Sequence, residues 1–87
     1  MDMEKVFILS VKDIFNGEEK RLVGINEFKM GTDESKKIIH GKITDFYDED
    51  TDFEDGELDT MVDTLSNGME YFKYDEKWYF EEIFCLN

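Results

Sequence analysis

Two strand-like runs joined by a tight-turn dipeptide place the strongest limit on how this chain folds. Lys5 to Phe15 and Lys20 to Met30 are rich in β-branched and aromatic residues, and Asn16-Gly17 lies between them. Such side chains favour strands, and Asn-Gly favours hairpin turns because both residues tolerate a positive φ. Both faces of the first run are apolar, which is typical of a central strand. An N-terminal hairpin is therefore expected, and with it a fold that contains an antiparallel sheet.

The remaining residues predict three more strands and one helix. After a polar connection over Gly31 to Lys37, the run Ile38 to Tyr47 has the composition of a third strand. Glu57 to Ser66 changes to the spacing of a short amphipathic helix. Met69 to Tyr74 and Trp78 to Leu86 are expected to form a second hairpin. The order β-β-β-α-β-β predicts an α+β fold, with an antiparallel sheet of about five strands packed against one helix.

Length and composition indicate one domain over residues 1–87. A hydrophobic content of 40% and an aromatic content of 15% are enough for one core and argue against disorder. Cys85 is the single cysteine, which favours a reducing compartment, and the first residues fit neither a signal peptide nor a membrane span. Ala, Pro and Gln are absent, as AT-rich coding would produce. We therefore expect a cytoplasmic protein of a low-GC bacterial host cell or its phage.

The acidic residues are concentrated in one part of the chain. The thirty residues from Ile43 to Phe72 contain eleven acids and no Lys or Arg, while the net charge of the whole chain is −13. The other 57 residues hold 12 acids and 10 bases and are close to neutral. Self-repulsion of like charges disfavours a compact state, so a basic partner is expected. Direct binding to nucleic acid or to an anionic membrane is not expected, because phosphates would be repelled.

The spacing of these acids suits the imitation of nucleic acid. If Asp48 to Glu54 is extended, alternate carboxylates lie on one face roughly 6.6 Å apart, similar to neighbouring phosphates on one strand. The outer face of the expected helix would continue this anionic surface, which would fit a Lys/Arg groove built for a phosphate backbone. The expected partner-binding residues are Asp45, Asp48, Glu49, Asp50, Asp52, Glu54, Asp55, Glu57, Asp59 and Asp63.

Three aromatic residues, Phe46, Tyr47 and Phe53, lie within the acidic stretch. If they are exposed, they are possible interface anchors flanked by charge, and if they are buried they belong to the core. For the stretch as a whole, the alternative to a binding surface is a solvated acidic face without a partner.

Asp48 to Asp59 also has some features of a calcium-binding loop. The first, third and fifth positions are aspartates, as in an EF-hand. Phe53 then stands where the sharp turn needs glycine, and Asp59 stands where a bidentate Glu is usual. A calcium-binding module is therefore a third hypothesis only, and no residue is assigned as a metal ligand.

Residues with catalytic chemistry are few and isolated. His40 is the only histidine and has no cysteine near it in sequence, so it is expected as a surface residue. Cys85 lies in an apolar run without a cationic neighbour, and no serine has the context of a nucleophile elbow. CxxC pairs and Gly-rich phosphate loops are absent. We expect neither an enzyme nor a bound cofactor.

In its size, acidity and α+β make-up, and in the acidic segment from Asp45 to Asp63, the chain resembles the small acidic inhibitors of phages and mobile elements. These include DNA-mimic anti-CRISPR and anti-restriction proteins and uracil-glycosylase inhibitors. The resemblance covers bulk properties and no family motif, so no functional residue is carried over from it. It implies a stoichiometric inhibitor that occupies the basic nucleic-acid-binding groove of a host defence protein, such as a CRISPR effector or a restriction enzyme.

More loosely, the chain is similar to the acidic immunity proteins that block a toxin nuclease, and this gives an alternative function. Such a protein would bind its basic partner through a mixed aromatic and acidic patch at the active site. The sequence leaves open whether the protein is a monomer or a homodimer, because an exposed edge strand is able to pair with a second copy.

Overall fold

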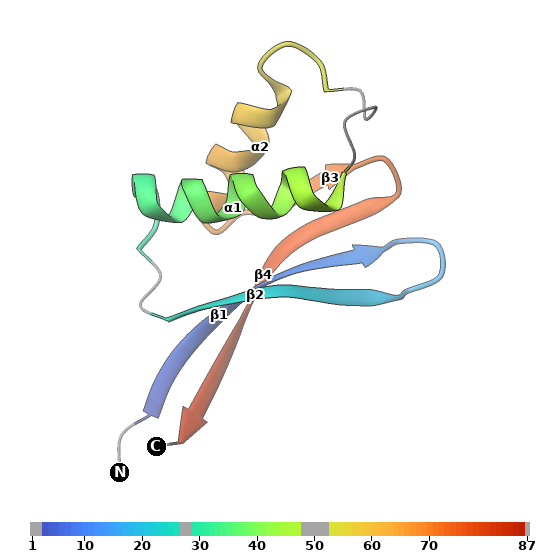
Figure 1. The fold of residues 1–87 in the computed structure, drawn as a ribbon. Helices are drawn as coiled ribbons and strands as arrows, with labels where there is room; N and C mark the ends of the chain where they lie inside the picture. The colour runs from blue at the N-terminus through green and yellow to red at the C-terminus, as the bar shows by residue number, and fades with distance from the viewer. Residues whose placement is uncertain (1–2, 27–28, 48–52, 87) are drawn as a thin grey trace.

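Four antiparallel strands and two helices make up the computed structural model, which describes residues 3–26, 29–47 and 53–86 (Figure 1). The elements are β1 (Met3–Asp13), β2 (Glu19–Asn26), α1 (Asp33–Phe46), α2 (Glu57–Ser66), β3 (Tyr71–Lys73) and β4 (Glu76–Leu86). The strand order is β2-β1-β4-β3, and both helices cover the same face of the sheet. The predicted α+β class with an antiparallel sheet is confirmed, although the described residues contain four strands and two helices.

The first hairpin is present where the sequence predicts it. β1 pairs with β2 on one side and with β4 on the other, as expected for a central strand. In the loop to β2, the carboxylate of Asp13 accepts hydrogen bonds from the N–H groups of Phe15 at 2.9 Å and Asn16 at 3.1 Å. Gly17 has a φ of 76°, a conformation that glycine adopts without steric cost. The Asn16-Gly17 signal therefore marks the turn correctly.

The third predicted strand is wrong, because Ile38 to Tyr47 lies almost entirely in α1. The helix begins at Asp33, inside the segment expected to be a polar connection. Thr32 caps its N-terminus by accepting a hydrogen bond from the N–H of Ser35 at 3.3 Å. This cap satisfies one of the N–H groups that a helix leaves without a partner in its first turn.

The spacing of two isoleucines explains this error. Ile39 and Ile43 are fully buried and stand four residues apart. A separation of four places two side chains on one face of a strand, with its period of two, and also on one face of a helix, with its period of 3.6. The β-branched composition favours a strand only weakly, and burial of an apolar stripe in the tertiary structure overrides it.

The second half of the chain follows the prediction more closely. α2 has the predicted bounds, and Asn67 and Gly68 follow its last residue. Its N-cap is Gly56, with a φ of 79°. The second hairpin is present with different limits, since β3 is only three residues long and β4 begins two residues before the predicted strand. Tyr74 and Asp75 form the turn between these strands.

The core lies between the sheet and the two helices. Trp78 of β4 and Leu9 of β1 are fully buried under residues from both helices. Because side chains alternate along a strand, the core residues of β1 and β4 share the face that the helices cover. The buried hydrophobic residues are Leu9, Val11, Ile39, Ile43, Tyr47, Met61, Val62, Leu65 and Trp78.

Gly41→Ala is expected to stabilise the protein, because Gly41 lies inside α1 and a Cβ added there would meet no atom within 4 Å. Alanine in place of a mid-helix glycine contributes about 0.5–1 kcal/mol. Thermal unfolding followed by circular dichroism measures this, and Tm should rise by roughly 2–8 °C. The control is Gly17→Ala, which should destabilise because its φ of 76° disfavours alanine. A lower Tm for Gly41→Ala would contradict the helical placement of this residue.

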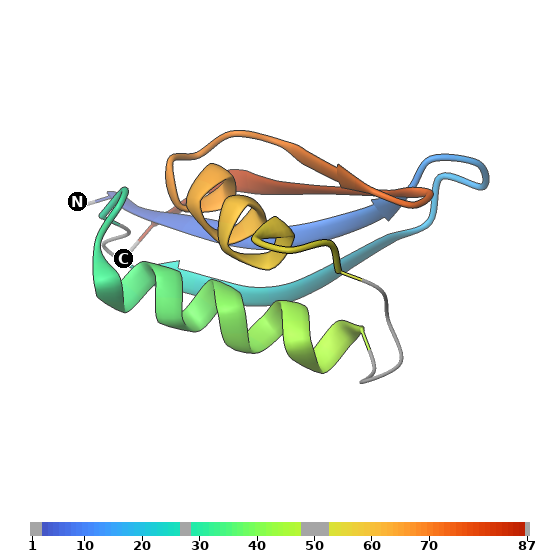
Figure 2. The same cartoon turned by 90° about the horizontal axis from the view of Figure 1, so that it is seen from above.

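The elongated molecule has two different ends, as Figures 1 and 2 show. Its principal extents are 47 × 32 × 19 Å. The turns of both hairpins and the last turn of α1 lie at one end, and the start of β1 and the end of β4 lie together at the other. Neither helix of the described residues has the length and apolar character needed to cross a lipid bilayer.

Candidate functional site

The two hairpin turns lie side by side and gather acids from distant parts of the sequence. The N–H of Ile14 donates to the carbonyl of Asp75 at 2.9 Å, which joins the β1–β2 loop to the β3–β4 turn. The last turn of α1 lies at the same end (Figure 2). Glu54 lines a groove together with Tyr74 of the β3–β4 turn. We call this region the acidic end and define it by Asp13, Glu18, Asp45, Glu54, Asp55, Asp75 and Glu76.

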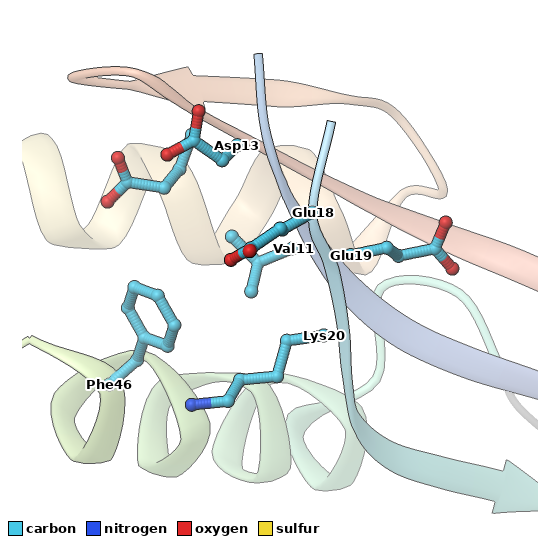
Figure 3. Close-up of a pocket in the computed structure, with 7 residues that line it drawn as sticks. Val11, Asp13, Glu18, Glu19, Lys20 and Phe46 are labelled. Atoms are coloured by element: carbon cyan, nitrogen blue, oxygen red, sulfur yellow. The ribbon is translucent and has the colours of Figure 1, made fainter. Parts of the chain in front are cut away.

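A groove of about 440 Å³ opens at the acidic end, between the β1–β2 hairpin and the last turn of α1. In Figure 3 the side chains of Asp13 and Glu18 extend toward this space, whereas Glu19 points away from it. Phe46 forms an aromatic wall, and the ammonium group of Lys20 lies 5.8 Å from the centroid of its ring. The groove therefore combines carboxylates with an apolar surface, a combination that suits the side chain of a partner's Lys or Arg.

Lys20 lines the groove together with Asp13 and Glu18 but forms no ion pair with either of them. Lys12 and Lys77 are cross-strand partners on the face of the sheet opposite the helices. Among the ion pairs between described residues, none includes a member of the acidic end. These ion pairs are Arg21–Glu19, Arg21–Glu81, Lys36–Asp63, Lys73–Glu57 and Lys77–Glu70.

The predicted partner-binding residues divide into four groups, one of which is the half-buried Glu57 alone. Asp45, Glu54, Asp55 and Asp59 are exposed. Asp63 is also exposed, but its carboxylate lies 3.1 Å from the ammonium group of Lys36. The extended spacing expected from Asp48 to Glu54 stays a prediction, because four of the acids lie outside the described residues: Asp48, Glu49, Asp50 and Asp52.

Glu57 has an internal role in addition to its place among the predicted residues. It accepts hydrogen bonds from the N–H of Glu54 at 3.0 Å, the ammonium group of Lys73 at 3.1 Å and the hydroxyl of Tyr71 at 3.3 Å. The backbone N–H of Glu54, followed by Lys73, holds the pKa of Glu57 below its usual range. Glu57 therefore joins the N-terminus of α2 to β3 and fixes the orientation of the adjoining acids.

Lys73 is a buried cation surrounded by aromatic rings. Its side chain is only 4% exposed, and its ammonium group lies 4.2 Å from the ring centroid of Phe53 and 4.5 Å from that of Tyr74. Contacts of this kind stabilise a desolvated ammonium group through the ring quadrupole. Lys73 thus holds Phe53, which precedes α2, against the β3–β4 hairpin.

The three aromatic residues predicted as interface anchors or core belong largely to the core. Tyr47 is buried, and its hydroxyl accepts a hydrogen bond from the indole N–H of Trp78 at 3.0 Å. Burial raises the pKa of Tyr47, and the nearby carboxylate of Glu76 adds to the effect. Phe46 and Phe53 are half-buried, and each ring packs edge-on against Tyr47, at 5.0 Å and 5.9 Å between centroids. The contact between Tyr47 and Phe53 brings together the two residues on either side of residues 48–52.

Several carboxylates of the acidic end oppose the stability of the fold. Asp45 lies in the last turn of α1, where the helix dipole disfavours negative charge. Asp13 and Glu76 are directly opposite each other on neighbouring strands, where like charges are destabilising. Asp13 offsets part of this cost through its hydrogen bonds to the N–H groups of Phe15 and Asn16, whereas Asp45 has no such compensation among the described residues.

Reasoning from sequence missed the contribution of the hairpin turns. Four acids of the acidic end lie outside the acidic stretch from Ile43 to Phe72, in segments that contain both acidic and basic residues. They are Asp13, Glu18, Asp75 and Glu76. Both turns were predicted, but their adjacency depends on the pairing of β1 with β4, which no short-range pattern reveals. The exposed rings of Phe72 and Tyr74 beside Glu54 were missed as well.

The described residues contain no group of three or more His, Cys, Asp or Glu side chains arranged to hold a metal ion. Five residues of the twelve-residue calcium loop, including its first three aspartates, lie outside the described residues. No protein-family model, curated protein or solved structure matches this chain. The candidate site is therefore argued from the physical properties of the acidic end.

Proposed function

We propose that this protein is a stoichiometric inhibitor that imitates nucleic acid and occupies the basic groove of a host defence protein, of the anti-CRISPR or anti-restriction type. The observation that supports this proposal is the acidic end, where two hairpin turns, the end of α1 and the start of α2 bring carboxylates together without ion pairs among the described residues. A dense anionic surface of this kind accelerates association with a basic groove and displaces the phosphate backbone from it.

The unfavourable positions of these acids add to the support. Asp45 opposes the dipole of α1, and Asp13 faces Glu76 across the β1–β4 pair. Proteins accept such losses of stability at positions that serve binding or catalysis. Binding to a positively charged partner is the function that these acidic positions support best.

The experiment uses DNA-cellulose loaded with proteins from a lysate of a low-GC bacterium and eluted with the purified protein. We expect the wild type to release a basic protein from the DNA as a stoichiometric complex, and to do so less efficiently at high salt. The variant Asp45→Lys/Glu54→Lys/Asp55→Lys should lose this release, because three carboxylates of the acidic end become positive. Affinity should fall at least 100-fold, since each reversed contact costs on the order of a factor of ten.

The matched control is Asp33→Lys/Glu34→Lys/Glu70→Lys, which changes the net charge equally at exposed positions outside the acidic end. The two α1 substitutions oppose the helix dipole, so circular dichroism must first confirm that the fold is retained. This variant should release the partner nearly as well as the wild type. Equal release by both triple variants would contradict a specific acidic surface. A partner that keeps its nucleic acid and loses only catalysis would instead support the immunity-type alternative.

A further inference from the structure

Three large aromatic side chains are exposed at or beside the acidic end. Phe15 in the β1–β2 loop is 80% exposed, Phe72 on β3 is 58% exposed and Tyr74 in the β3–β4 turn is 61% exposed. The hydrogen bond from Ile14 to Asp75 places the two turns next to each other. Exposed rings that are close together and surrounded by polar residues are typical of a surface that binds a partner.

Phe72 and Tyr74 line a second groove, of about 330 Å³, together with Glu54 and Glu57. Tyr74 lies beside these carboxylates, whereas Phe72 is the cross-strand partner of Lys77, so its ring projects from the opposite face of β3 at the same edge of the sheet. Along the chain, rings and carboxylates also alternate at short range, since Phe15 follows Asp13 and Tyr74 precedes Asp75. A partner that covers this surface must accommodate negative charge and flat apolar groups together.

The ring of Tyr74 contacts the ammonium group of Lys73 at 4.5 Å and yet stays largely exposed, in a turn position that is unfavourable for tyrosine. Tyr74 has a φ of 53° and is the only non-glycine among the described residues with a positive φ. In two-residue hairpin turns this position favours Asn, Asp or Gly, because a bulky side chain is strained there. A tyrosine that is exposed and strained makes a poor turn residue and a suitable contact residue.

We propose that the partner groove is one that binds single-stranded nucleic acid, an inference that rests on the proposed function. In a duplex the bases are stacked inside and the phosphates outside, so imitation of a duplex requires carboxylates alone. Grooves for single strands combine Lys and Arg side chains with aromatic platforms that stack on unpaired bases. A surface of carboxylates interleaved with exposed rings matches the second kind of groove. Phe15, Phe72 and Tyr74 take the place of the bases, and the carboxylates take the place of the phosphates.

The test compares two columns that carry DNA of the same sequence, one single-stranded and one duplex, each loaded with the same low-GC bacterial lysate and eluted with the purified protein. We expect release of a stoichiometric partner from the single-stranded column and not from the duplex column. Release only from the duplex column would overturn this inference and leave the proposed function standing. Release from neither column would overturn the proposed function and this inference with it.

The ring variant Phe15→Ser/Phe72→Ser/Tyr74→Asn keeps every charge and places a residue that tolerates positive φ at position 74. Loss of stacking on each ring costs roughly tenfold in affinity, so we expect binding to the released partner to weaken on the order of 100-fold or more. The double variant Phe15→Ser/Phe72→Ser leaves the β3–β4 turn unchanged and serves if the triple variant fails to fold. Its affinity for the released partner should fall on the order of 10-fold.

The matched control is Met30→Ser/Met69→Ser, which removes two apolar side chains that are 60% and 63% exposed. They lie beside the start of α1 and the end of α2, away from the acidic end. This control should bind the released partner as the wild type does. Release from the single-stranded column that is equal for the wild type, the control and the ring variant would overturn the role of the rings.

Discussion

Trp78→Ala is expected to lower the free energy of unfolding by about 3–5 kcal/mol, the range for large aromatic side chains removed from a core. Trp78 is fully buried on β4 and packs edge-on against Phe46 at 5.3 Å between ring centroids. Its indole N–H is also the donor to the hydroxyl of Tyr47 at 3.0 Å. Alanine would leave both a cavity and a buried hydroxyl without this donor, and the two losses add. A domain of this size has about 4–13 kcal/mol of stability in total, so much of the population would unfold.

Urea unfolding measures this effect. It is followed by circular dichroism at about 222 nm, near the minimum of the helical spectrum. Trp78→Phe is the control that keeps an aromatic ring and removes the N–H donor, and it should cost about 1–3 kcal/mol. Tyr47→Phe removes the acceptor instead and leaves the indole N–H of the fully buried Trp78 without its partner, so it should also cost about 1–3 kcal/mol. A loss below about 1 kcal/mol for Trp78→Ala would contradict the placement of this residue in the core.

Lys73→Met is expected to destabilise the protein by about 2–3 kcal/mol. Removal of one partner from a fully buried ion pair costs about 3–5 kcal/mol, and the smaller value applies because the side chain of Glu57 is 22% exposed. Methionine fills a similar volume, so the loss reports the charge and its contacts with the rings of Phe53 and Tyr74 more than the packing. Urea unfolding measures the change.

The double variant Lys73→Met/Glu57→Gln separates the ion pair from the remaining contacts. The carbonyl oxygen of glutamine still accepts from the N–H of Glu54, its NH2 group takes the place of the second oxygen and donates to the hydroxyl of Tyr71, and no unpaired charge is left. The double variant should therefore be more stable than Lys73→Met alone, which gives a favourable coupling energy for the pair. Simple addition of the two single effects would mean that Lys73 and Glu57 do not stabilise each other. Amide exchange should also accelerate near Phe53 in Lys73→Met, because Lys73 packs against that ring.

Local signals account for the correct part of the predicted fold. Asn16-Gly17 marks a turn because glycine at position 17 adopts a positive φ without strain. The apolar spacing in Glu57 to Ser66 fits a helix and no other period, and the helix was predicted with the observed bounds. For Ile39 and Ile43 the spacing of four fits either period, and the N-cap at Thr32 is a local signal for the helix that the prediction did not use.

The candidate site was only partly predictable for a different reason. Asp45, Glu54 and Asp55 belong to a dense acidic stretch, which composition alone identifies. Asp13 and Glu76 are 63 positions apart along the chain and become neighbours only through strand pairing. The aromatic residues were predicted by proximity to the acids, but exposure depends on which face of β3 or which turn position a ring occupies. Phe46, Tyr47 and Phe53 consequently pack inward, and Phe15, Phe72 and Tyr74 are exposed instead.

The pairing of Met3 with Leu86 has a practical consequence for attaching this protein to something else. Both ends of the chain leave the sheet together, at the pole opposite the hairpin turns. A fluorescent label, a solid support or a second domain joined at either terminus would project away from the carboxylates and the rings. A short peptide could likewise link the two termini, and new termini could then be placed in another loop to give a circular permutant. The proposed contact surface would still face solvent.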